Sequence, residues 1–274
     1  YGREMGYALG YDGRRLARDI RAGNAPYPLF DTPLNQRLID AAAGVIVHSA
    51  YVAEKIRRYR PGVPMATIPQ LVKPDSGRSF RQTLDVPDGA VIFGSFGQIT
   101  SEKQIDVALA AFQKVHRKHP DTRYLLVGET RPDVDLDAIL FDLGLRDCVI
   151  HVGYVDNFDD FTAWLRVPDV VVNLRYPTIG ETSAVALRAM AAARPVIVYD
   201  HGWYSELPGD AALMVPPGDT AALEGAMEAL AHSADLRQSM GRAGYKYVRE
   251  QCDPARAAQA YAEFLRATLE AARA

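Results

Sequence analysis

The sequence predicts an α/β protein built around a doubly wound, parallel sheet. From about residue 90 to 250, short β-branched runs alternate with longer segments whose apolar residues recur at helical spacing. Strands separated by helices are joined by right-handed crossovers, so they form a parallel sheet covered on both faces. Small and polar residues follow several of these runs, where doubly wound sheets bind their ligands.

The first 70 residues predict a smaller α/β unit. Its expected elements are helices over residues 1–25, 34–43 and 50–60 and strands over 44–48 and 65–70. Ser49 is a good N-cap for the third helix, and Pro61 with Gly62 ends it. Two strands make a poor sheet, so we expect residues 1–70 to be the remnant of a larger domain.

Residues 71–89 are polar, contain several prolines and glycines, and predict a linker. Beyond it we expect strands over residues 91–96, 124–127, 149–152, 170–174, 196–199 and 213–215. The expected helices cover residues 103–116, 135–143, 158–164, 182–193 and, in several pieces, 220–272. This order predicts a nucleotide-binding domain over residues 90–252. Asp253 and Pro254 then start a final helix over residues 253–274, which we expect to pack toward the N-terminal domain.

The composition excludes several classes of protein. With 48% apolar and 24% charged residues, the chain is neither disordered nor fibrous. A formal charge of −3 provides no basic field for nucleic acid. No apolar run approaches the roughly 20 residues that span a bilayer. The two cysteines, Cys148 and Cys252, form neither a disulfide framework nor a metal cluster, so we expect a cytoplasmic protein without a bound metal.

Small residues follow the first strand of the larger domain. Gly97 and Gln98 stand there, and Lys103 follows at the start of the next helix. Small residues let a backbone approach a phosphate, while a helix N-terminus and a lysine add positive charge. Phosphate binding is one interpretation, and a tight turn with a solvated lysine is the other.

The segment after the fourth strand of that domain is the most informative. It contains Arg175, Gly180, Glu181, Thr182 and Ser183. Gly180 permits an unusual backbone angle, and the next three residues place a carboxylate and two hydroxyls at a helix N-terminus. They can hold an anion and sugar hydroxyls, although a well-capped helix explains them equally well. Capping alone does not explain Arg175.

Two further loops follow strands. Tyr154 and Val155 come after the third strand and offer a surface for a base or ribose. Residues 200–208 gather polar and aromatic groups, including Glu206, as binding loops do; a packed turn is the alternative.

In their order and spacing, these residues resemble the family 4 (group 1) retaining glycosyltransferases, which have the GT-B fold of two facing Rossmann-like domains. The likeness runs from about Gly44 to Leu265. Its pieces are residues 44–49, 97–103, 124–128, 153–155, 177–193, 194–198 and 200–206.

The resemblance implies a complete nucleotide-sugar-binding domain over residues 90–252 and a partial, acceptor-side domain over residues 1–70. It implies transfer of a sugar, with retention, from a UDP- or GDP-linked donor to a glycan or lipid-linked acceptor, without metal or other cofactor. Polysaccharide, lipopolysaccharide or glycoconjugate synthesis is the expected setting. The chain starts at Tyr1 and lacks the glycine-rich loop and first strands of such proteins, so we expect a fragment of a longer polypeptide.

The resemblance also implies roles for single residues. Glu181 and Lys103 are the catalytic candidates, with Lys103 at the diphosphate. Tyr154 and Val155 are expected at the base, and Glu206 closes the pocket. The expected donor-binding set is Gly97, Gln98, Lys103, Tyr154, Val155, Arg175, Gly180, Glu181, Thr182, Ser183, Arg188 and Glu206.

The chain departs from the family at three of these positions. Gln98 stands where an arginine is common, and Gly180 and Arg188 stand where the family has two glutamates. We expect the adjacent Glu181 to replace the first glutamate. For Arg188 we expect pairing with a phosphate or with an acidic neighbour.

Other function classes stay open. A non-catalytic nucleotide-sugar-binding or scaffolding module is favoured by Gln98, Arg188 and the missing strands. An epimerase or a phosphorylase of the same fold is disfavoured, because the sequence shows no evident acid/base pair for the first and no evident pyridoxal-binding lysine for the second. An oxidoreductase is disfavoured because no third glycine follows the first strand at Rossmann spacing.

The expected partners are a nucleotide sugar and its acceptor, without nucleic acid, and the oligomeric state is left open. For the arginine-rich residues 3–21 we favour a solvated or interdomain helix. Contact with an anionic membrane surface is the alternative.

Overall fold

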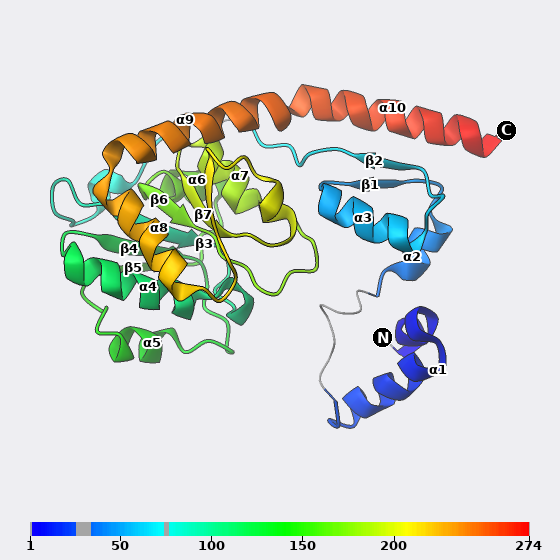
Figure 1. Cartoon of the computed structure of the whole chain (residues 1–274), viewed down its shortest axis with the longest axis horizontal. Helices are drawn as coiled ribbons and strands as arrows, with labels where there is room; N and C mark the ends of the chain where they lie inside the picture. The colour runs from blue at the N-terminus through cyan, green and yellow to red at the C-terminus, as the bar shows by residue number, and fades with distance from the viewer. Residues whose placement is uncertain (1, 26–33, 74–76, 274) are drawn as a thin grey trace. The chain divides into compact units, whose positions relative to one another are not determined.

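The computed structural model describes residues 2–25, 34–73 and 77–273, which divide into two compact units (Figure 1). The larger unit comprises Gln70–Tyr176 and Thr182–Arg256. The smaller unit comprises Tyr1–Pro69, Pro177–Glu181 and Ala257–Ala274. Tyr1, residues 74–76 of the predicted linker and Ala274 of the predicted final helix lie outside the described residues.

A six-stranded, fully parallel sheet forms the centre of the larger unit. Its strands are β3 (Ile92–Phe96), β4 (Arg123–Val127), β5 (Val149–Gly153), β6 (Val170–Val172), β7 (Val196–Tyr199) and β8 (Ala212–Val215). Their order across the sheet is β5-β4-β3-β6-β7-β8. The chain therefore winds outward from β3 in one direction and from β6 in the other, which confirms the predicted doubly wound α/β fold.

Helices cover both faces of this sheet (Figure 1). They are α4 (Ile105–Lys118), α5 (Leu136–Asp142), α6 (Phe158–Leu165), α7 (Ala184–Ala191), α8 (Thr220–His232) and α9 (Ala234–Gln251). One core joins the sheet to α4, α5 and α8 through residues such as Leu109, Leu140 and Met227. The other joins it to α6, α7 and α9 through Leu165, Leu187 and Val248.

Side-chain caps fix where several of these helices begin. Asp135 accepts a hydrogen bond from the backbone N–H of Ala138 at 3.0 Å, and Asp219 accepts one from Ala222 at 2.8 Å. Such caps satisfy backbone donors that have no partner inside the helix.

The predicted helix over residues 103–116 was wrong at its start. Ser101–Lys103 form a separate 3₁₀ turn, η2, and α4 begins only at Ile105. Gln104 between them has a φ of 51° and a left-handed conformation, which interrupts the helical hydrogen bonding.

The smaller unit contains two parallel strands, β1 (Val45–Val47) and β2 (Met65–Thr67). Its helices are α1 (Gly2–Arg21), α2 (Gln36–Ala41), α3 (Ala50–Tyr59) and the main part of α10 (Pro254–Arg273). Ser49 caps α3 by accepting from the Val52 N–H at 3.2 Å, as predicted. A Cβ at Gly44 would lie 2.9 Å from Phe264 Cζ, so α10 contacts the residue that precedes β1.

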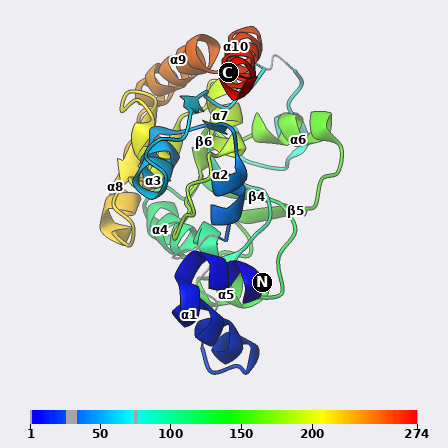
Figure 2. The ribbon, with the colours of Figure 1, turned by 90° about the vertical axis from the view of Figure 1, so that its right-hand side faces the viewer.

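The helix predicted over residues 1–25 forms as α1 over Gly2–Arg21, but it is interrupted in its middle. Gly10 has a φ of 62° and a ψ of −134°, and α1 is bent there into two halves (Figure 2). Its buried residues are Met5, Gly13 and Ala17, whereas Leu9 is 40% exposed. A glycine at the bend has access to a backbone angle that other residues rarely adopt.

No helix in the described part of the chain is both long and apolar enough to cross a membrane.

Two helical glycines provide a matched test of the packing between α7 and α9. A Cβ at Gly241 in α9 would lie 2.2 Å from the carbonyl oxygen of Ala193, whereas a Cβ at Gly225 in α8 meets nothing within 4 Å. We expect Gly241→Ala to destabilise the protein by roughly 1–3 kcal/mol, because backbone atoms must move. Gly225→Ala is expected to stabilise it by up to about 1 kcal/mol, because alanine favours the helix. Urea unfolding of both variants measures the difference, and equal stability would contradict the packing described.

Candidate functional site

The carboxyl ends of β3 and β6 meet at the point where the sheet changes its winding direction. The two strands are neighbours, with Phe93 paired to Val170 and Gly94 to Val171. Their connections leave toward opposite sides, which is the arrangement that places ligand sites in doubly wound folds. The residues that follow these two strands therefore form the candidate site.

Two glycines bring the loops after β3 and β4 close together. A Cβ at Gly128 would lie 2.1 Å from the carbonyl oxygen of Gly97, and both residues have positive φ, 153° and 85°. A ring nitrogen of His151 on β5 lies 2.9 Å from the carbonyl oxygen of Gly128. Gly97 was predicted from the sequence, but the roles of Gly128 and His151 were not. The sequence signal available for them was a glycine directly after one strand and a histidine within the next strand.

Lys103 lies over Gly97. Its ammonium donates a hydrogen bond to the carbonyl oxygen of Phe96, the last residue of β3. A Cβ at Gly97 would be only 2.8 Å from the Lys103 Nζ, so the absence of a side chain at Gly97 leaves space for the ammonium. Burial, and then the positive charge of Arg175, lowers the pKa of Lys103 to about 8. Two predicted residues thus supply positive charge at the end of the central strands.

A buried polar network fixes the start of α7. Ser183 Oγ accepts hydrogen bonds from Asn173 Nδ2 at 2.7 Å and from the N–H of Ala186 at 3.2 Å. Asn173 Nδ2 also lies 2.8 Å from the hydroxyl of Tyr204. The Ser183 hydroxyl therefore serves as a helix cap. Asn173 and Tyr204, which were not among the predicted site residues, hold that cap against the ends of β6 and β7.

The Thr182 hydroxyl donates a hydrogen bond to Gln70 Oε1, a residue far away in the sequence, at 2.7 Å. Glu206 lies at the end of the 3₁₀ helix η3 (Gly202–Glu206), which follows β7, and its side chain is exposed. Tyr176, after β6, packs on His201, after β7, with ring centroids 5.3 Å apart. These contacts tie the loops after β6 and β7 together.

Glu181 organises the short segment that precedes α7 and belongs to the smaller unit. Its Oε2 accepts from Thr178 Oγ1 at 2.7 Å and from the backbone N–H groups of Ile179 and Gly180 at 3.1 Å each. Gly180 has a φ of 111°, and a Cβ there would lie 2.7 Å from Val52 Cγ2. Glycine is therefore required at this position by both angle and space.

A cavity of about 220 Å³ lies beside Gly97, within the larger unit. It is lined by Gly97, Gln98, Val127, Gly128, Glu129, Tyr154, Val155 and Phe161. Four of these residues were predicted as donor-binding from the sequence, and the structure brings them together. The Tyr154 side chain is 73% exposed, so its ring is available at the surface.

Arg188 lies elsewhere. Among the described residues, it lines a different cavity, of about 500 Å³, with Phe158, Asp159 and Lys73 among its neighbours. Its guanidinium lies over the ring of Phe158, 5.1 Å from the centroid, and burial lowers its pKa. Of the two partners expected for Arg188, an acidic neighbour is replaced in the structure by this contact with an aromatic ring, and a phosphate stays a prediction.

The pKa of Lys103 provides a direct test of the site geometry. Burial is the larger cause of the lowered pKa and Arg175 the smaller one. We expect an NMR pH titration of Lys103 to have its midpoint near 8. Arg175→Gln should raise that midpoint only partway toward the ordinary lysine pKa of 10.5, because burial remains. A wild-type midpoint near 10.5 would contradict the buried position of the ammonium.

Comparisons with known proteins agree with this architecture. The family model described as glycosyl transferases group 1 matches residues 90–233. An alpha-D-kanosaminyltransferase of Streptomyces kanamyceticus is 26% identical over 147 residues, which are 53% of this chain and 37% of the relative. An uncharacterized glycosyltransferase of Methanocaldococcus jannaschii is 30% identical over 130 residues, 47% of this chain and 32% of the relative. The matched part thus spans about a third of each of these relatives.

Solved structures share the fold. Sucrose-phosphate synthase from Thermosynechococcus elongatus superposes with a TM-score of 0.76 at 22% identity, covering 92% of this chain and 66% of that one. The Anabaena protein HepE, solved with UDP, has a TM-score of 0.74 at 18% identity, covering 85% and 65%. The likeness to these GT-B proteins confirms the GT-B-like fold expected from the sequence. Because the family model matches more than half of its residues, this chain belongs to the glycosyl transferases of group 1.

Proposed function

We propose that this chain binds a nucleotide sugar and serves in its transfer to an acceptor. The observation that carries the proposal is the position of Lys103. Its buried ammonium lies at the end of the central strand, over Gly97 and near the charge of Arg175. Two cations beside glycine backbone suit the diphosphate of a nucleotide-sugar donor.

The proposed role of Lys103 and Arg175 follows from the chemistry of transfer. When the bond between sugar and diphosphate breaks, negative charge develops on the leaving phosphate. Fixed positive groups that are largely removed from water stabilise that charge strongly. The N-terminus of α7, capped by Ser183, adds positive potential from the neighbouring strand end. The proposal needs no bound metal, because these groups supply the positive charge.

The nucleoside is proposed to occupy the cavity beside Gly97. Tyr154 offers an exposed aromatic ring there, and Gln98 offers an amide that can donate and accept hydrogen bonds. A UDP-linked donor is favoured over a GDP-linked one, because HepE was solved with UDP and with UDP-glucose, and Staphylococcus aureus TarM with UDP.

Glu181 is the proposed residue for the donor sugar. Its three hydrogen bonds from residues 178–180 hold the carboxylate in one position. A fixed negative charge favours the oxocarbenium-like centre that forms at the sugar. We further propose that transfer retains the anomeric configuration and that the acceptor is a glycan or a lipid-linked sugar.

Donor binding is tested by calorimetric titration with UDP, GDP and their sugar conjugates. We expect Lys103→Ala to weaken binding of the preferred nucleotide by at least about tenfold, because a charge-assisted contact to phosphate is lost. Lys118→Ala is the matched control, since that ammonium pairs on the surface with Glu224 and Glu228. Equal losses in both variants, or no binding of any nucleotide by the wild type, would contradict the proposal.

Transfer itself is tested with the full-length protein, a nucleotide-sugar donor and a panel of acceptors. The anomeric proton of the product in NMR distinguishes retention from inversion. We expect Glu181→Gln to lower the rate of transfer while leaving UDP affinity within about threefold, because the role proposed for the carboxylate concerns the sugar and not the nucleotide. Donor binding without any transfer would instead favour a non-catalytic nucleotide-sugar-binding module.

A further inference from the structure

The bent helix α1 forms a pocket of its own in the smaller unit. Its two halves meet at Gly10 and fold back on each other, with no room for a side chain between them. A Cβ at Gly13 in the second half would lie 1.9 Å from the carbonyl oxygen of Met5 in the first. Met5 is fully buried, so this close contact forms the centre of the hairpin.

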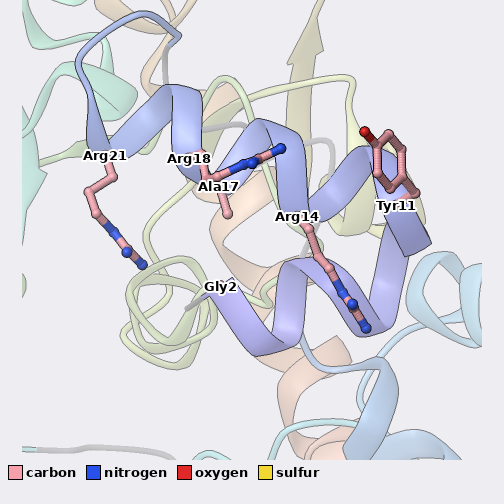
Figure 3. Close-up of a pocket in the computed structure, with 6 residues that line it drawn as sticks. All are labelled: Gly2, Tyr11, Arg14, Ala17, Arg18 and Arg21. Atoms are coloured by element: carbon pink, nitrogen blue, oxygen red, sulfur yellow. The ribbon is translucent and has the colours of Figure 1, made fainter.

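Arginines line one side of this hairpin (Figure 3). A cavity of about 400 Å³ is surrounded by Gly2, Tyr11, Arg14, Ala17, Arg18 and Arg21. Half of these residues carry a permanent positive charge, and no carboxylate lines the cavity within the part of α1 that the structure describes. Arg14 also lines a neighbouring cavity with Arg3 and Arg37.

Two glycines of the first half accommodate the arginine side chains of the second half. A Cβ at Gly6 would lie 2.9 Å from Arg14 Cγ, and a Cβ at Gly2 would lie 3.6 Å from Arg21 Nη2. In Figure 3 the side chains of Arg14 and Arg21 extend from the second half of α1 toward the first. Their positions therefore follow from the fold of the hairpin.

Two acidic groups of this unit are engaged with other residues, and Asp12 and Asp19 of α1 line neither cavity. Glu4 forms an ion pair with Arg37 at 3.1 Å. Asp40 accepts hydrogen bonds from the hydroxyls of Tyr7 at 2.6 Å and Tyr59 at 2.7 Å, which ties α1 to α2 and α3. Across residues 2–25, 34–73 and 77–273, the ion pairs leave Arg14, Arg18 and Arg21 without a carboxylate partner.

From this arrangement we propose that the cavity formed by Arg14, Arg18 and Arg21 binds a phosphate group. Guanidinium groups bind phosphate through paired, charge-assisted hydrogen bonds, and several arginines around one cavity neutralise an anion that carries more than one charge. The phosphate group belongs either to a soluble phosphate ester or to the headgroup of a phospholipid.

The proposed phosphate site shares no residue with the proposed donor site. Its test is therefore separate from the test of sugar transfer. Lys103→Ala, which removes a donor-site cation, should leave the binding at α1 unchanged. A variant that loses UDP binding but keeps phosphate binding at α1, or the reverse, distinguishes the two proposals.

The test compares the wild-type chain with the triple variant R14Q/R18Q/R21Q and the control R15Q. Glutamine keeps the helix propensity of arginine nearly unchanged, and circular dichroism checks that each variant is folded. Arg15 is exposed on the same helix and does not line either cavity. The soluble probes are inorganic phosphate and glycerol 3-phosphate, followed through the arginine Nε–H signals in NMR. The lipid probes are phosphatidylcholine vesicles with and without phosphatidic acid, followed by sedimentation.

We expect the triple variant to bind the preferred probe at least about tenfold more weakly than the wild type, with R15Q within about threefold of it. Binding of glycerol 3-phosphate without vesicle binding identifies a soluble ester as the source of the phosphate. Binding that requires phosphatidic acid in the vesicle identifies a lipid headgroup. The proposal is overturned if R15Q loses as much affinity as the triple variant, or if the wild type binds neither form of phosphate. Equal binding to both kinds of vesicle would also overturn it.

Discussion

The burial of β3 on both faces is the constraint on which the larger unit depends. All five of its residues are buried between two helical layers. Ser95 is the one polar side chain among them, and it bonds to the Val172 carbonyl oxygen and the Tyr124 hydroxyl, each at 2.7 Å. A strand that is covered on both sides has no free surface for chemistry. Reactive groups can then stand only beyond its end, where Gly97 and Lys103 are found.

The fold was predictable where the periodicity of the sequence is local. Short β-branched runs and amphipathic segments gave the six strands of the large sheet, and Ser49 marked the start of α3. The predicted helices differ from the observed ones where a residue adopts an unusual backbone angle, which the spacing of apolar residues does not indicate. Gln104 adopts a left-handed conformation that delays α4, and Gly10 bends α1. The conformations of Gln104 and Gly10 depend on how the segments on either side of them pack. A short stretch of sequence gives no information about that packing.

The candidate site was predictable in part, for a similar reason. Strand ends indicated Gly97, Tyr154 and Val155, and the fold gathers them around one cavity. Gly128 was missed because its importance arises from a contact with Gly97, a residue on another loop. Arg188 stands where the family has a glutamate and was expected to pair with a phosphate or an acidic neighbour, whereas its guanidinium lies over an aromatic ring. The surroundings of Gly128 and Arg188 are set by contacts with segments that are distant in the sequence, so sequence patterns alone did not predict them.

The lowered pKa of Lys103 has a consequence for the thermodynamics of ligand binding. With a pKa of about 8, a substantial fraction of the protein carries a neutral lysine at mildly alkaline pH. An anion bound beside this group favours the ammonium form, so the complex takes up a proton that the free protein lacks. The apparent affinity for any such anion then decreases as the pH rises through 8, and the measured heat of binding includes the ionisation heat of the buffer.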